Sequence, residues 1–213
     1  YFFLKASIKG LKGGHSGDDI NKKRANAIKI LSRFLYMEQD KMDLRLAQFN
    51  SGKLHNAIPR DGIIVFAVPA NEKETVRVDW NIFTANVEEE FHVTDTAMEF
   101  GLESTDAEAV IAKDCSTRFI RCMQAIDNGV FAMCQDEALA WMVETSNNVA
   151  SVITSENEIN IVASQRSNVM SNLENETNTI KAVFELAGAE VKMSDGYPAW
   201  KMNPNSKLTE AAV

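Results

Sequence analysis

One short loop carries the residues best suited to chemistry. Residues 10–19 read Gly-Leu-Lys-Gly-Gly-His-Ser-Gly-Asp-Asp, with four glycines in the first eight positions. Glycine lets the backbone turn sharply and lets another molecule approach closely. His15, one of three histidines in the chain, stands in the middle of this loop. Such a histidine could donate a hydrogen bond to a developing oxyanion. The residues alone slightly favour a solvent-facing histidine without a role.

Two further segments hold candidate binding residues. Residues 51–60 read Ser-Gly-Lys-Leu-His-Asn-Ala-Ile-Pro-Arg, and Asn56 within them could contact a ligand or simply satisfy a turn. Arg166 ends a predicted strand in the segment Ser-Gln-Arg-Ser. An arginine can bind a carboxylate through two parallel hydrogen bonds, although an exposed arginine at a strand end is common.

The spacing of metal-binding residue types predicts no metal site in this chain. It contains no His-Glu-x-x-His sequence and no His-x-Asp pair, and its three cysteines do not have zinc-site spacing. Its many acidic residues are scattered over predicted polar faces, where solvation is the default explanation.

Composition excludes several classes of protein. The net charge of -8 argues against a nucleic-acid partner, and no apolar run has the length needed to cross a membrane. The N-terminal residues lack the pattern of a signal peptide, and three unpatterned cysteines suit a reducing compartment. We therefore expect a cytoplasmic protein.

Hydrophobic periodicity predicts the elements that position these residues. In the first half the pattern predicts four strands and two helices, and Asp18 or Asp19 is the expected N-cap of the first helix. The order strand, helix, strand, strand, helix, strand is that of a ferredoxin-like unit. The expected strands span residues 2–9, 43–50, 62–69 and about 96–103, and the expected helices span 19–37 and 72–93.

The second half repeats much of this order without the opening strand. The predicted helices span about 116–125 and 173–187, and the predicted strands span 143–154, 158–166 and 189–193. The fold class is therefore α+β, with two ferredoxin-like α/β sandwich subdomains whose antiparallel sheets carry helices on one face. The expected subdomains are residues 1–105 and 106–196, and residues 197–213 begin a segment that returns to a neighbouring domain.

The loop around His15 and the Asn-Ala-Ile-Pro segment together resemble the lid of the aminoacyl-histidine dipeptidases, a group within the M20 metallopeptidase family. The resemblance implies a lid or dimerisation-type domain that closes over dipeptides, Xaa-His among them. It also implies that His15 steadies the tetrahedral intermediate, while Asn56 and Arg166 bind the substrate. The two zinc ions would lie in a separate catalytic domain, so this chain alone is expected to be inactive. The implied partners are the dipeptide, that catalytic domain and a second copy of the chain.

Two alternatives remain open at this stage. A stand-alone ferredoxin-like binding or dimerisation module would explain the fold but not the glycine-flanked His15. A complete metal-independent hydrolase would need a Ser-His-acid or Cys-His arrangement, and none is visible in the sequence.

Overall fold

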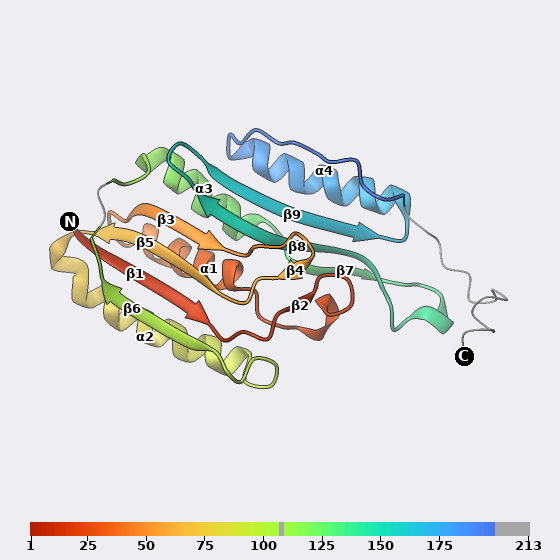
Figure 1. The fold of residues 1–213 in the computed structure, drawn as a ribbon, viewed down its shortest axis with the longest axis horizontal. Helices are drawn as coiled ribbons and strands as arrows, with labels where there is room; N and C mark the ends of the chain where they lie inside the picture. Colours follow the sequence, from red (N-terminus) through yellow and green to blue (C-terminus); the bar gives the residue numbers. More distant parts are fainter. Residues whose placement is uncertain (107–108, 199–213) are drawn as a thin grey trace.

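The computed structural model describes residues 1–106 and 109–198, which form an antiparallel sheet backed by a layer of helices (Figure 1). Strands follow the order β6–β1–β5–β3–β8–β7, and β9 pairs with the other edge of β8. The strands are β1 (Phe2–Lys9), β3 (Arg45–Ser51), β5 (Gly62–Val68), β6 (Glu99–Ser104), β7 (Gly129–Met133), β8 (Val143–Thr154) and β9 (Ile159–Ser167).

The helices pack side by side in the order α2–α1–α3–α4. A separate ribbon of two short strands lies beside the sheet, formed by β2 (Gly14–His15) and β4 (Ala57–Ile58). The α-helices are α1 (Ala27–Gln39), α2 (Lys73–Glu90), α3 (Lys113–Ala125) and α4 (Met170–Leu186), and the short 3-10 turns are η1 (Ile20–Lys22), η2 (Ala70–Glu72) and η3 (Glu137–Leu139). In the described part of the chain, no helix has the length and apolar character needed to cross a membrane.

Helix α1 lies at the centre of the hydrophobic core. Its apolar side chains recur at helical spacing, so one face is buried against the sheet. The Phe34 ring packs edge-on against Trp80 of α2, with 4.7 Å between ring centroids. On the other side, Phe49 of β3 packs against Phe119 of α3 at 5.8 Å. One continuous core therefore spans both halves of the chain.

Strand β8 joins the first half, whose strand order β6–β1–β5–β3 is ferredoxin-like, to the second half in a single sheet. The second half has the order α3–β7–β8–β9–α4 and so does not repeat that unit. The C-terminal end of β8 pairs with β3 through Asn50↔Ile153 and Ser51↔Val152, while its N-terminal part pairs with β7. Strand β9 covers the opposite edge of β8. The α+β architecture with antiparallel strands and helices on one face is as expected, and the two units share their sheet.

The first helix begins later than the sequence predicts. Residues 20–22 form only the turn η1. Lys23 then adopts a left-handed backbone conformation (φ 52°), which prevents η1 from continuing into α1 as one helix. Asn26, rather than Asp18 or Asp19, is the N-cap, because its side chain accepts hydrogen bonds from the N–H groups of Ile28 and Lys29. Asp19 instead holds the loop around His15.

The end of the second half also differs from the prediction. The expected strand at residues 189–193 does not form: Gly188, at φ +79°, closes α4, and residues 189–198 have no strand partner. The pattern does not predict strand β7, because this strand is only five residues long and most of its side chains are exposed. Most of the expected return segment, residues 199–213, lies outside the described residues.

Candidate functional site

The two motif segments are neighbours in the structure. Strands β2 and β4 pair antiparallel, with His15 opposite Ala57 and Gly14 opposite Ile58. The N–H group of Ser16 extends this pairing by donating to the backbone oxygen of Asn56 at 2.9 Å. We refer to residues 14–16 and 56–58 as the β2–β4 ribbon. The ribbon places His15 beside the Asn-Ala-Ile-Pro segment.

The His15 ring has one nitrogen engaged and one available. Its Nδ1 atom lies 3.3 Å from the backbone nitrogens of both Gly17 and Asp18, and these N–H groups donate to it. In the neutral ring, Nε2 therefore carries the hydrogen. Nε2 has no hydrogen-bond partner among the described residues, and 42% of the side chain is exposed. The Asp18 carboxylate also lies 3.4 Å from Nδ1, so the ring contacts the domain through Nδ1 and Nε2 is left as a hydrogen-bond donor.

Asp19 fixes the backbone of the loop. Its carboxylate accepts from the His15 N–H at 2.8 Å, from Lys22 at 2.7 Å, and lies 3.1 Å from Arg24. The hydrogen bonds from Lys22 and from the His15 backbone hold the pKa of Asp19 below its ordinary value. A side chain at Gly14 would collide with Asp19 and Arg24 at 2.3 Å, so only glycine fits there.

Arg166 reaches the same loop from the other half of the chain. It lies near the end of β9, and its Nε donates to the Ser16 hydroxyl at 3.3 Å. A methyl group added at Gly17 would lie 3.2 Å from the His15 ring and 3.5 Å from Arg166 Nη1. The structure thus brings the His15 ring and the Arg166 guanidinium next to the same glycine.

Asn56 is half-buried within the ribbon. Its backbone oxygen holds Ser16, and its side-chain amide makes no hydrogen bond within residues 1–106 and 109–198. The three residues selected from the sequence, His15, Asn56 and Arg166, therefore occupy one region. His55, the histidine next to Asn56, is exposed.

Sequence reasoning gave no role to Asn148 of β8, which contacts the same region. Its side-chain nitrogen donates to the backbone oxygen of Ala57 at 2.9 Å. The available signal was the polar run Thr145-Ser146-Asn147-Asn148 inside a strand, all four residues of which are buried.

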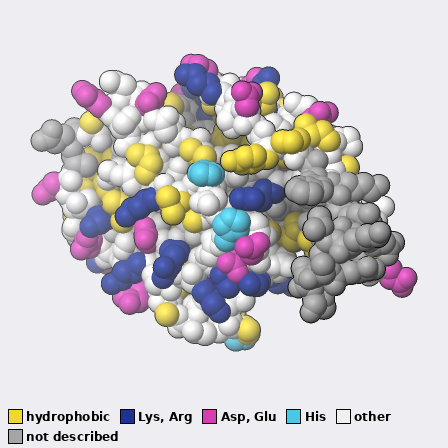
Figure 2. Space-filling model, turned by 45° about the vertical axis from the view of Figure 1, so that its right-hand side comes forward, with side chains coloured by type: hydrophobic (Ala, Val, Ile, Leu, Met, Phe, Trp, Pro, Cys, Tyr) yellow, Lys and Arg dark blue, Asp and Glu magenta, His cyan; other side chains and the backbone are white. Residues whose placement is uncertain are grey.

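Figure 2 shows that histidine side chains lie close to basic and acidic ones near the centre of one face.

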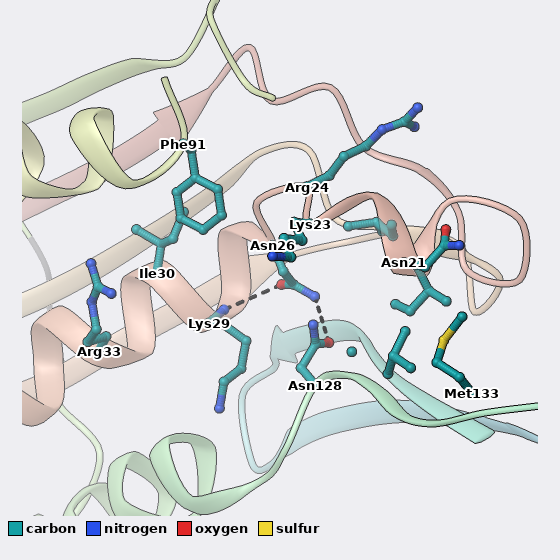
Figure 3. Close-up of a pocket in the computed structure, with 14 residues that line it drawn as sticks. Asn21, Lys23, Arg24, Asn26, Lys29, Ile30, Arg33, Phe91, Asn128 and Met133 are labelled. Carbon is teal, nitrogen blue, oxygen red and sulfur yellow. Dashed lines mark hydrogen bonds between the residues drawn. The ribbon is translucent and has the colours of Figure 1, made fainter. Parts of the chain in front are cut away.

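A cavity of about 720 Å³ lies elsewhere, between η1, α1 and β7 (Figure 3). Its floor holds Asn26 and Asn128, whose amides are joined by a hydrogen bond of 3.1 Å. Three of its four basic side chains have partners: Arg24 with Asp19, Arg33 with Glu90, and Lys29 with backbone oxygens at the end of α3. His15, Asn56 and Arg166 do not line this cavity.

The described residues also offer no ligand set for a metal. Within them, no group of three or more His, Cys, Asp or Glu side chains is arranged to hold an ion. What the site can do is donate hydrogen bonds from His15 and Arg166, and carry positive charge at Arg166.

Comparison with known families shows which proteins the chain is similar to. Residues 6–95 match the M20 peptidase dimerisation domain. This chain carries an M20 dimerisation domain. Over 207 residues it is 35% identical to the cytosol non-specific dipeptidase of Escherichia coli K12, covering 96% of this chain and 42% of that enzyme.

A solved structure extends the match to nearly all of the chain. The aminoacylhistidine dipeptidase of Vibrio alginolyticus superposes with a TM-score of 0.92 at 35% identity, over 98% of this chain and 42% of that one. The similarity to this dipeptidase therefore includes the second half of the chain, where Arg166 lies. The chain spans less than half the length of either relative.

Proposed function

We propose that this domain is the lid of an M20 dipeptidase and that it supplies substrate-binding groups to an active site located elsewhere in the parent enzyme. The observation that carries the proposal is the meeting of the His15 ring and the Arg166 guanidinium at Gly17. His15 comes from the β2–β4 ribbon and Arg166 from β9 of the main sheet, and both residues are exposed.

Each residue has a role suited to its chemistry. Because Arg166 Nε is engaged by Ser16, its two terminal nitrogens remain to bind the carboxylate of a dipeptide. The side-chain amide of Asn56, which has no hydrogen-bond partner among the described residues, adds a further contact to the substrate backbone. His15 Nε2 donates to the oxygen that becomes negative when the peptide bond is attacked.

The remaining chemistry belongs to the rest of the parent enzyme. The proposal places a pair of zinc ions in the catalytic domain, where they would activate the attacking water. The names of the two relatives suggest dipeptides as substrates, aminoacyl-histidine among them, and action in the cytosol. The dimerisation-domain match suggests a homodimer. On this proposal the isolated domain binds but does not cleave.

Substitution of His15 in the full-length enzyme tests the proposal. His15→Ala should lower kcat by about 100- to 1,000-fold, the usual effect of losing one oxyanion donor, with a smaller change in KM. His92→Ala is the matched control, because His92 is an exposed histidine bonded only to the backbone of α2. Equal changes in kcat and KM, or an unchanged kcat, would contradict the role given to His15.

A further inference from the structure

Asn148 lies where the second half of the chain meets the β2–β4 ribbon. Its side chain is 1% exposed, and its Nδ2 donates to the Ala57 oxygen at 2.9 Å. In the described part of the chain, only two hydrogen bonds connect the second half to this ribbon: that one, and the bond from Arg166 to Ser16.

Strand pairing puts both contacts on the same face of the sheet. Asn148 is opposite Ser164, and Ser146 is opposite Arg166, in the ladder between β8 and β9. Because side chains alternate along a strand, Asn148 and Arg166 project toward the same side, which is where the ribbon lies. Asn147 projects to the other face, where it bonds to the Asp127 oxygen and to Gln165.

The Asn148 side chain is incompletely satisfied. Its Oδ1 atom is buried and has no hydrogen-bond partner among the described residues. A buried unpaired carbonyl is unfavourable, and an apolar side chain of similar size would avoid that cost. Asparagine carries this cost at position 148, and the one hydrogen bond that its side chain makes to residues that the structure describes is the bond to the ribbon.

We infer that Asn148 is a positioning residue that sets the spacing between His15 and Asn56 on the ribbon and Arg166 on β9. The inference rests on the proposed function. Asn148 holds Ala57, which pairs with His15 and directly follows Asn56. Without this bond the ribbon keeps its own pairing but shifts relative to Arg166, so that His15 and Arg166 no longer fit one dipeptide.

The test uses the full-length enzyme. Asn148→Leu should lower kcat by about 10- to 100-fold, the scale expected when a catalytic group is displaced by about 1 Å. The matched control is Asn147→Ala, which removes an equally buried amide with no bond to the ribbon. The control should lower the melting temperature but leave kcat within about twofold.

A double variant separates positioning from general loss of stability. In a His15→Ala background, Asn148→Leu should change kcat by less than about threefold, because the group it positions is already absent. The same loss in both backgrounds, or an unchanged kcat in the single variant, would overturn the inference. If Asn148→Leu does not fold, Asn148→Asp keeps the size and removes the donor, and it is judged by the same criteria.

The outcome also distinguishes this inference from the proposed function. If His15→Ala has no effect on kcat, the role of the lid in catalysis fails. If His15→Ala is strongly impaired and Asn148→Leu is not, only the positioning role of Asn148 fails.

Discussion

At the scale of residues, the arrangement around Gly17 depends on two side chains with different geometry. The His15 ring is oriented by two backbone N–H groups, so its free donor direction is set by the loop and not by solvent. Arg166 is held through Nε, so the two terminal nitrogens of its planar guanidinium remain available to bind a carboxylate with two parallel hydrogen bonds. A lysine at position 166 would keep the positive charge but could not form two parallel hydrogen bonds to a carboxylate.

Arg166→Lys in the full-length enzyme should therefore weaken binding of the substrate carboxylate. Loss of one charge-assisted hydrogen bond, worth about 1.5–3 kcal/mol, corresponds to a rise in KM of about 10- to 100-fold. Steady-state kinetics with a dipeptide and with its C-terminal amide provide the check. The amide lacks the carboxylate, so wild type and variant should treat it alike; a variant that discriminates against both substrates equally would contradict the assignment.

At the scale of elements, two polar side chains at the start of α1, the buried N-cap Asn26 and the half-buried Lys29, join the halves of the chain. The Asn26 amide caps α1 and also donates to Asn128 and to the Val149 oxygen. One turn later, the Lys29 ammonium donates to the oxygens of Met123, Gln124 and Ile126 at 2.6–3.2 Å, at the C-terminal end of α3. These carbonyls have no partner within their own helix, and a cation there also complements the helix dipole.

Asn26→Ala should lower the free energy of unfolding by about 2–4 kcal/mol, because it removes a helix cap and leaves buried partners unpaired. Asn160→Ala, at an exposed asparagine of β9, should change it by no more than about 0.5 kcal/mol. Urea denaturation measures both. Similar values for the two variants would show that the contacts of Asn26 contribute little.

Lys29 should make stability depend on pH in the alkaline range. Burial lowers the pKa of Lys29 to about 8 in the folded chain, against 10.5 for the exposed side chain. Between these values the unfolded chain binds more protons than the folded one, so the free energy of unfolding should rise with pH. The comparison is with Lys29→Met, which lacks the titrating group, in urea denaturation from pH 7.5 to 10.5. Parallel profiles for the two proteins would refute this.

At the scale of the whole molecule, the shared sheet and the continuous core indicate one cooperative unit. The junction between β3 and β8 is short, yet Thr154 strengthens it: its hydroxyl accepts from the Phe49 N–H at 2.9 Å and donates to the Phe49 oxygen at 3.1 Å. The aromatic contact of Phe49 with Phe119 lies behind the same junction.

We expect slowly exchanging amides in β1 and β5 to open with the same free energy as those in β8 and β9. Native-state hydrogen exchange of this chain measures that free energy for each strand. Thr154→Val, which removes both hydroxyl bonds with little change in size, should lower the free energy of unfolding of all four strands together. A lower opening energy confined to β8 and β9 would mean that the halves unfold separately.

Local pattern predicted most of the elements, but not how they are joined. The apolar run from Gly62 to Val68 and the helical spacing of α1 are visible in the sequence because they reflect burial of one face. The start of α1 was misplaced because Asp18 and Asp19 resemble N-cap residues. The pairing of β3 with β8 involves two residue pairs separated by about a hundred positions, which no local periodicity records.

For the candidate site too, the sequence predicted the individual residues but not how they are brought together. Family motifs singled out His15, Asn56 and Arg166, but their meeting depends on the ribbon and on the register between β8 and β9. Asn148 lacked any distinguishing local feature other than its place in a polar run, because its importance lies in a contact with a distant backbone oxygen.

The join between β3 and β8 also has a consequence during synthesis on the ribosome. Strand β3 ends at Ser51, but its second edge is completed only by Val152 and Ile153. At a translation rate of about 5–20 residues per second, those partners emerge roughly 5–20 seconds after β3 does. During that interval part of a strand edge in the nascent chain is open to pairing with other chains. The same pairing that unites the two halves therefore sets how long part of the β3 edge stays unpaired in the growing polypeptide.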